Sequence, residues 1–289
     1  MNSIIKNFIQ APVIKMERLD NFFIELSKKA CNMKCKHCYI PKNSFTMEKD
    51  FLEFKKIKTA LKQIKDMNIK MIYLTGGEPT IHPDFNQIIR LCLKISSVCV
   101  VTNGQTINEK KARFLKKIDN ESNFESIYIV SFEHFEEAKN DMLRGRGSYR
   151  KAVNALSCLI KYGFNPIVQV TDYYKESKET LFEGFSKIYE KLGADFEDIN
   201  LKITPYFSKE HTIGEYKFDP PKADPQKLDC ATSRIFTSKG VFACPILSGD
   251  FRARMGADMS DFSHKCVPDT KMCTQCIEFG AKAFSANWI

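Results

Sequence analysis

Short apolar segments alternate along the chain with longer segments in which apolar residues recur every three or four positions. The short segments, rich in Ile, Val, Phe and Tyr, predict six β-strands at residues 21–27, 71–75, 98–102, 126–131, 166–171 and 198–204. The longer segments predict helices at residues 47–67, 83–95, 108–118, 149–162 and 175–192. Alternation of this kind builds a parallel sheet with right-handed crossovers. Because six units are too few to close an eight-stranded barrel, we predict an α/β fold, a partial (β/α)6 parallel barrel.

The chain changes character after the sixth predicted strand. Residues 205–229 contain four prolines among charged residues and predict a linker. The segment 230–289 holds five cysteines and a predicted hairpin, 234–237 and 241–244, which turns at 238–240. It is too short for a large core of its own and is typical of a small unit stapled by metal. We therefore expect an N-terminal extension (1–20), the barrel (21–204), a linker (205–229) and a cysteine-rich unit (230–289).

Charge and hydropathy narrow the class of protein. The 289 residues carry a net charge of +9, and residues 1–75 hold 15 Lys and Arg against 7 Asp and Glu. About half of this excess lies between residues 49 and 70, where the helical period indicates a solvated helix face and argues against a nucleic-acid groove. No apolar run approaches the ~18 residues that a membrane span needs. The N-terminus also lacks a signal peptide, so we expect a cytoplasmic protein without a membrane partner.

The eleven cysteines are clustered in a way that is typical of metal sites. Their number is odd, and in a chain without a secretion signal clustered thiols indicate metal binding or catalysis more often than disulfides. One group lies early in the chain and another near its end. The remaining three lie alone in apolar segments and are expected to be ordinary core residues: Cys92, Cys99 and Cys158.

The early group follows the first predicted strand directly and consists of Cys31, Cys35 and Cys38. Three thiolates cannot complete a four-ligand site. A zinc ion would need His37 as its fourth ligand, and that ring would have to fold back sharply beside Cys38. A [4Fe–4S] cluster held by three thiolates leaves one iron open for a substrate or cofactor.

Further motifs stand at the ends of the next predicted strands. They read Leu74-Thr75-Gly76-Gly77-Glu78-Pro79, Val101-Thr102-Asn103-Gly104 and Ser131-Phe132-Glu133. Together with the three cysteines and His37 before the last of them, this order resembles the radical S-adenosylmethionine (radical SAM) enzymes over about residues 21–204. The Gly-Gly-Glu-Pro segment taken alone would also fit a plain turn.

The resemblance implies roles for individual residues. The three early cysteines would hold a [4Fe–4S] cluster, and Gly76, Gly77 and Glu78 would hold the methionine amine of S-adenosylmethionine. Polar contacts to the nucleoside, the ribose or the carboxylate are implied for Thr102, Asn103, Ser131 and Arg144, with Arg146 an alternative to the last. The rings of His37 and Tyr39 would flank the adenine, or they pack without contacting the cofactor.

The late cysteines are similar to the shortened "twitch" extension of radical SAM enzymes, a reduced form of the SPASM domain. That resemblance implies an auxiliary [4Fe–4S] cluster held by Cys230, Cys244, Cys273 and Cys276, with Cys266 spare. A structural zinc ribbon would use the same four thiols.

The implied chemistry is hydrogen abstraction. An electron donor such as flavodoxin or ferredoxin would reduce the first cluster, which would cleave S-adenosylmethionine to a 5′-deoxyadenosyl radical that takes hydrogen from a small-molecule substrate. The auxiliary cluster would aid oxidation or bind substrate, so both an oxidoreductase and an isomerase fit. Candidates for substrate contact or proton transfer are Glu133, His134, Gln169 and Asp172, although each also fits a solvated loop.

A peptide-modifying maturase is the alternative function. Only about thirty residues precede the first cysteine group, so we expect no leader-peptide domain at the N-terminus.

Overall fold

The computed structural model describes residues 12–40, 50–207, 224, 227–268 and 271–278. Its helices are α1 (Phe54–Ile64), α2 (Phe85–Cys92), α3 (Glu109–Asn120), α4 (Glu137–Arg144), α5 (Ser148–Lys161), α6 (Lys178–Lys191) and α7 (Lys271–Glu278). Its strands are β1 (Ile14–Lys15), β2 (Asn21–Glu25), β3 (Met71–Thr75), β4 (Ser97–Thr102), β5 (Ser126–Ser131), β6 (Ile167–Thr171), β7 (Leu201–Thr204), β8 (Ser233–Thr237), β9 (Gly240–Phe242), β10 (Arg254–Gly256) and β11 (Lys265–Cys266).

A nine-stranded sheet organises the described residues. Strands β2 to β7 lie in sequence order and pair in parallel, in agreement with the predicted partial barrel. Strand β8 joins the other side of β2 in parallel, and β9 and β10 continue the sheet antiparallel. Because parallel strands end at the same edge, the loops after β2 to β7 meet there.

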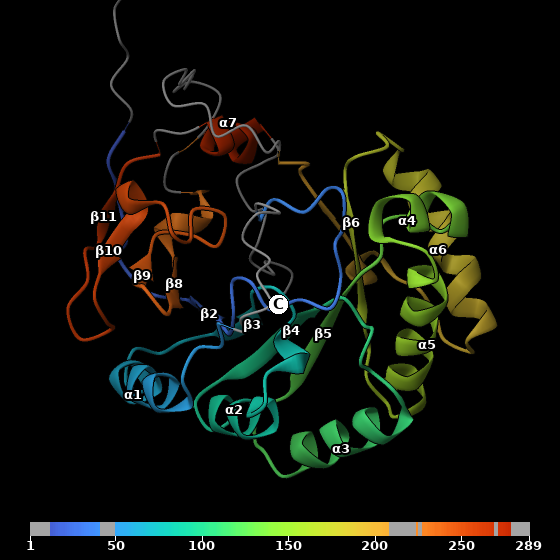
Figure 1. The fold of residues 1–289 in the computed structure, drawn as a ribbon, viewed down its shortest axis with the longest axis horizontal. Helices are drawn as coiled ribbons and strands as arrows, with labels where there is room; N and C mark the ends of the chain where they lie inside the picture. Colours follow the sequence, from blue (N-terminus) through green and yellow to red (C-terminus); the bar gives the residue numbers. More distant parts are fainter. Residues whose placement is uncertain (1–11, 41–49, 208–223, 225–226, 269–270, 279–289) are drawn as a thin grey trace, which may run out of the picture.

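Apolar cores cover both faces of this sheet. Figure 1 shows α1, α2, α3 and α5 along the outer side of the curved sheet. Alternate strand residues point toward these helices, among them Phe22 and Ile24, whereas Phe23 and Tyr73 stack on the inner face with ring centroids 4.3 Å apart. Strands covered on both faces read as short continuous apolar runs, which explains why the sequence identified them.

Several elements differ from the sequence prediction, and helix α7 and strands β1, β10 and β11 were not predicted. Helix α1 begins at Phe54 instead of residue 47, because the preceding backbone pairs with the end of β2: Leu52 N–H donates to the carbonyl of Leu26 at 2.8 Å. Part of the predicted start, residues 41–49, lies outside the described residues. Residues 198–200 form a 3-10 turn before β7, and helix α4 was not predicted.

The C-terminal residues are tied to the barrel by strands. The predicted hairpin is present as β8 and β9, and β8 pairs with β2. Strand β11 pairs with β1 near the start of the chain. Most of the predicted linker lies outside the described residues, and the boundaries expected for the four segments stay predictions. Among the described residues, no helix is both long and apolar enough to cross a membrane.

Candidate active site

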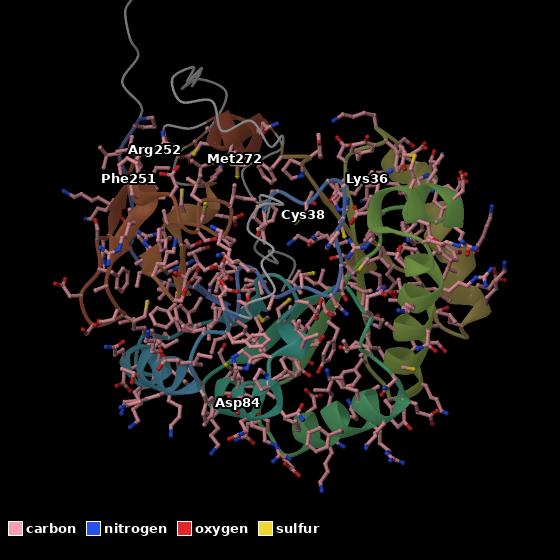
Figure 2. The ribbon with its side chains drawn as sticks, viewed as in Figure 1. Lys36, Cys38, Asp84, Phe251, Arg252 and Met272 are labelled. Atoms are coloured by element: carbon pink, nitrogen blue, oxygen red, sulfur yellow. The ribbon has the colours of Figure 1, made fainter. Side chains whose placement is uncertain are left out.

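An open cavity of about 1170 Å³ lies at the edge of the sheet where the parallel strands end. Residues at the ends of β3 to β7 contribute to its wall, as do the three early cysteines. Figure 2 shows Cys38 between the barrel loops and the C-terminal residues around Met272. Ten of the predicted site residues line this cavity outside the cysteines: His37, Tyr39, Gly76, Gly77, Thr102, Asn103, Ser131, Glu133, Arg144 and Gln169.

The loop that carries Cys31, Cys35 and Cys38, called the cysteine loop below, begins where Gly76 and Gly77 pack closely against the backbone of residues 27–30. Gly77 N–H donates to the carbonyl of Ser27 at 2.6 Å, and Glu78 N–H donates to that of Ala30 at 2.9 Å. A Cβ on Gly76 would lie 2.2 Å from the Ser27 oxygen, and one on Gly77 would lie 2.2 Å from the Ala30 oxygen. Only glycine allows this approach, and Gly76 also adopts a φ of +121°. The glycines therefore place the loop as well as facing the cavity.

Gly76 and Gly77 form a glycine cradle at the cavity wall. Glu78 follows this cradle in the chain and does not line the cavity. Its carboxylate is 2% exposed and accepts hydrogen bonds from Thr102 Oγ1 at 2.7 Å, from Asn103 N–H at 2.7 Å, and from both the backbone and the hydroxyl of Thr80. These donors tie the ends of β3 and β4 together. The predicted contact with a ligand ammonium stays a prediction, since protein donors already surround this side chain.

Asn103 links the end of β4 to the cysteine loop. Its side-chain amide donates to Asn32 Oδ1 at 2.7 Å and lies 3.9 Å from Cys31 Sγ. Burial raises the pKa of the Cys31 thiol to about 11, so this sulfur gives up its proton readily only when it binds a metal ion.

A buried charged network joins the cysteine loop to α4 and β6. Glu133, 2% exposed, accepts from Arg144 Nη1 at 2.7 Å and from Thr171 N–H at 2.8 Å, and its carboxylate lies 3.0 Å from His37 Nε2. Burial alone would raise the pKa of Glu133, but the neighbouring His37 and Arg144, together with hydrogen bonds from His37 and Thr171 N–H, outweigh it and hold the pKa at about 2. The carboxylate is thus ionised and fully engaged, which suits positioning better than proton transfer.

Arg144 and His37 are placed by this network at the cavity wall. Arg144 Nη2 lies 4.0 Å from Met33 Sδ, and the Arg144 carbonyl lies 4.0 Å from Cys35 Sγ. The His37 side chain is 9% exposed, and its Nδ1 atom has no hydrogen-bond partner among the residues that the structure describes. A buried polar atom of this kind is normally satisfied, so Nδ1 at a cavity wall indicates a ligand partner.

Of the three other candidates for substrate contact, Gln169, His134 and Asp172, one lies at the large cavity and two do not. Gln169 lines the cavity. The His134 ring is fully buried: Nδ1 accepts from Glu136 N–H at 2.9 Å, and Nε2 lies 3.3 Å from Glu176 Oε1. Asp172 pairs with Lys175 at 2.6 Å. Neither His134 nor Asp172 is among the residues that line the large cavity.

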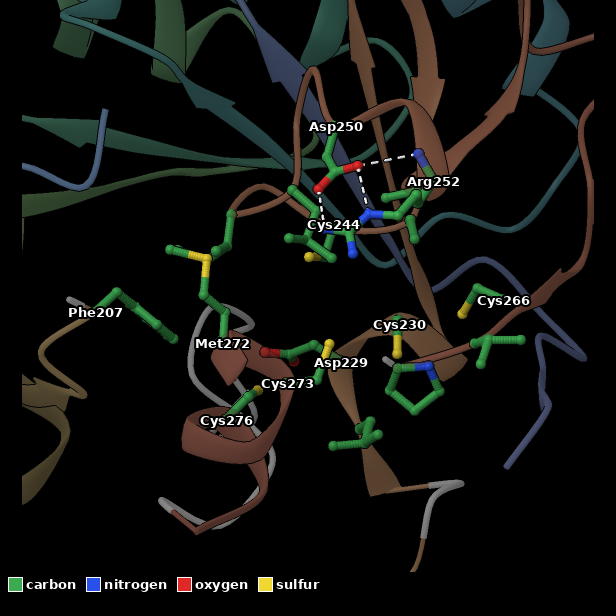
Figure 3. A pocket seen from close by; sticks show the side chains of 17 residues that line it. Phe207, Asp229, Cys230, Cys244, Asp250, Arg252, Cys266, Met272, Cys273 and Cys276 are labelled. Atoms are coloured by element: carbon green, nitrogen blue, oxygen red, sulfur yellow. Dashed lines mark hydrogen bonds and ion pairs between the residues drawn. The ribbon is translucent and has the colours of Figure 1, made fainter. Parts of the chain in front are cut away.

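All five late cysteines line a second cavity, of about 700 Å³ (Figure 3). Cys273 and Cys276 lie on α7, Cys244 follows β9, and Cys230 lies in the 3-10 turn 229–231 before β8. Cys266, expected to be spare, lines the same cavity from β11. Among the described residues, no three His, Cys, Asp or Glu side chains converge as ligands of a single metal ion. The shared cavity is therefore the observation that joins these thiols.

Phe207 contributes to the wall of both cavities. Cys244 faces the second cavity, while its neighbour Pro245 faces the first. Neither Phe207 nor Pro245 stood out in the sequence, because an apolar residue in a predicted linker and a proline after a strand carry no chemical signal.

Comparison with known proteins identifies the family. The model of the Radical SAM superfamily matches residues 28–183. This chain belongs to the radical SAM superfamily.

The similar curated proteins include both a cyclase and a maturase. GTP 3′,8-cyclase of Psychromonas ingrahamii is 24% identical over 216 residues, which cover 70% of this chain and 62% of that protein. Mycofactocin maturase MftC of Mycobacterium tuberculosis is 30% identical over 177 residues, which cover 60% of this chain and 42% of the maturase. The chain thus spans less than two thirds of the length of either curated relative.

Solved radical SAM structures share the fold. Streptococcus suis SuiB bound to S-adenosylmethionine superposes with a TM-score of 0.60 at 16% identity, covering 83% of this chain and 63% of SuiB. SuiB bound to the precursor peptide SuiA gives a TM-score of 0.63 at 16% identity, and the match covers 86% of this chain and 64% of SuiB.

Membership of the radical SAM superfamily implies a [4Fe–4S] cluster and S-adenosylmethionine, and the first cavity fits both. Its three thiols are the donors that iron prefers, and their number leaves one iron open. The glycine cradle and the unpartnered His37 Nδ1 offer backbone groups and a polar atom to a ligand in the same cavity.

Proposed function

We propose that this radical SAM enzyme abstracts hydrogen from a small-molecule substrate and passes an electron to an auxiliary [4Fe–4S] cluster in a twitch/SPASM-like C-terminal unit. The observation that carries the proposal is the pair of thiol-lined cavities that share Phe207. In this proposal the barrel comprises residues 21–204, after an extension at 1–20, and a linker at 205–229 leads to the unit at 230–289.

Each of the two iron–sulfur clusters would have its own cysteine ligands. Cys31, Cys35 and Cys38 would hold the first cluster, and four of the five late cysteines would hold the auxiliary one. When bound, the first cluster and S-adenosylmethionine supply reductive cleavage to methionine and a 5′-deoxyadenosyl radical. An electron donor such as flavodoxin or ferredoxin would supply the electron.

The chain's own residues bind and orient the cofactor. The Gly76–Gly77 backbone faces the methionine end, and Arg144, fixed by Glu133, offers its guanidinium to a carboxylate or ribose. His37 Nδ1 and the Tyr39 ring are available to the adenine. Ser131 and Gln169, which pair with each other across β5 and β6, face the same cavity and are available to ribose and substrate.

The wall between the cavities serves the second half of the reaction. Phe207 and Pro245 are apolar side chains at this wall and would limit the access of water between the substrate and the auxiliary site. A substrate there that has lost a hydrogen atom would give one electron to the auxiliary cluster and a proton to solvent, which yields a two-electron oxidation. This balance favours an oxidoreductase over an isomerase, because an isomerisation needs no acceptor.

A peptide-modifying maturase is the second candidate. It is supported by the names of two relatives, the mycofactocin maturase and the SuiB structure that contains a precursor peptide.

Deoxyadenosine production tests the proposed function. The reconstituted, reduced enzyme is incubated without oxygen with S-adenosylmethionine and either small-molecule pools or peptides encoded beside its gene. Acceleration by a small molecule, with a product two hydrogens lighter, supports the proposal. Acceleration by peptides alone supports the maturase, and an absence of deoxyadenosine under every condition contradicts both.

A further inference from the structure

The second cavity contains more thiols than a fully ligated cluster needs. A [4Fe–4S] cluster takes four cysteines, and five line this cavity. The following inference rests on the proposed auxiliary cluster and concerns the fifth, Cys266.

Cys266 lies directly beside Cys230. Both thiols line the second cavity, each is the main influence on the pKa of the other, and Cys266 is 7% exposed. Backbone contacts fix both residues: Cys266 pairs with Ile14 across β11 and β1, and Cys230 lies in the turn that leads into β8. The two sulfurs therefore reach the same side of the cavity from separately anchored segments (Figure 3).

A buried positive charge lies at this same corner. Arg234 is 0% exposed, and it donates to the carbonyls of Cys230 at 2.7 Å, Ser233 at 2.6 Å and Ser263 at 3.3 Å. Its Nε atom has no partner, and among the described residues the groups that act on its charge are the thiols of Cys230, Cys244 and Cys266, with no carboxylate. A buried guanidinium needs a compensating negative charge, which thiolates bound to iron would supply.

We infer that Cys230 and Cys266 form one exchangeable ligand corner of the auxiliary cluster, with Arg234 as its counter-charge. Either sulfur can bind the same iron while the other remains a thiol. In the exchange the incoming thiol releases its proton to solvent and the departing thiolate takes one up. No electron is transferred, so the step needs no oxidant or reductant.

Iron content and electron paramagnetic resonance of full-length, anaerobically reconstituted variants test the inference. The single variants Cys230→Ala and Cys266→Ala should each retain the iron of the wild type, and Cys230→Ala should change the signal of the auxiliary cluster alone. The double variant should lose about half of the iron. Cys92→Ala, which removes a buried thiol on α2, is the matched control and should change neither measurement.

The outcomes separate this inference from the proposed function. A wild-type protein that binds only one cluster contradicts the auxiliary cluster itself. If the wild type binds two, loss of one in either single variant overturns the exchangeable corner, as does retention of both in the double variant. The remaining first-cluster signal shows in each case that the variant has folded.

Discussion

Removing the Glu133 carboxylate should destabilise the barrel far more than removing an exposed ion pair from the same region. The Glu133→Ala change leaves Arg144, whose side chain is 6% exposed, without its counter-charge. It also leaves Thr171 N–H without its acceptor and separates His37 from α4. The perturbation therefore affects three segments at once.

The size of the effect follows from burial. Breaking a buried ion pair by deleting one partner costs about 3–5 kcal/mol, because the other charge stays in a low-dielectric site. For a chain of this size each kcal/mol lowers the melting temperature by roughly 2–4 °C, so we expect a fall of about 6–20 °C. Glu133→Gln keeps one of the two acceptor oxygens and should lower the free energy of unfolding by about 1–3 kcal/mol.

Thermal melting under anaerobic conditions, followed by circular dichroism, measures the difference. Glu137→Ala is the matched control, because Glu137 pairs with Arg150 at 3.0 Å on the surface, with side chains 46% and 80% exposed. That pair should contribute at most about 1 kcal/mol. Equal melting temperatures for Glu133→Ala and Glu137→Ala would refute the reasoning.

The pH dependence gives an independent check on the same carboxylate. The folded pKa of Glu133, about 2, lies below its ordinary value of 4.5. A lowered pKa contributes stability that is fully present above pH 4.5 and is lost as the pH falls toward 2. The stability difference between wild type and Glu133→Gln should therefore be constant above about pH 5 and shrink below it. A difference that grew on acidification would show that the carboxylate is not held by positive charge.

Three further predictions concern the two thiol sites. The triple variant of Cys31, Cys35 and Cys38 to Ala should retain about half of the wild-type iron, and complete loss would contradict two separate clusters. Gly77→Ala places a Cβ 2.2 Å from a backbone carbonyl oxygen, so calorimetric titration should show weaker binding of S-adenosylmethionine, and an unchanged affinity would exclude the cradle. Arg234→Met should lower the potential of the auxiliary cluster alone in a redox titration, because a nearby positive charge favours the reduced form; a shift of both potentials would contradict this.

The parallel sheet could be predicted from sequence because its strands are buried on both faces. Strand β3 has the predicted bounds, and each of its residues except Thr75 is buried. A run of apolar residues between polar turns is the direct trace of such burial. Parallel topology then brings distant motifs together without further information, since the ends of successive strands meet at one edge.

Helix α4 could not be predicted from the sequence, because the side that it buries is mainly polar. Its buried residues are Asn140, Leu143 and Arg144, so its inward face is mainly polar and carries no apolar period. Asn140 accepts from Glu133 N–H at 3.1 Å and donates to Ser148 Oγ at 2.9 Å. Hydrogen bonds to partners in other elements position this helix, and a local pattern cannot reveal them.

The same limit applied to the choice among the late cysteines. Spacing along the chain identifies the CxxC pair of Cys273 and Cys276, because both lie on one short helix. It cannot show that Cys266 lies beside Cys230, since that contact depends on the pairing of β11 with β1, some 250 residues earlier in the chain. The resemblance to the twitch order left Cys266 spare, whereas in the structure it lines the same cavity as the other four late cysteines.

Glu78 shows that a sequence motif can single out a residue without determining what its side chain does. The sequence motif places a carboxylate beside two glycines and suggests that the carboxylate meets the ligand. In the structure the same carboxylate fixes Thr102 Oγ1 and Asn103 N–H from behind, and the glycine backbone faces the cavity. Because Asn103 in turn contacts the cysteine loop, a change at Glu78 would move the loop and β4 together. The residue can thus be required for cofactor binding through the position of its neighbours, without touching the cofactor.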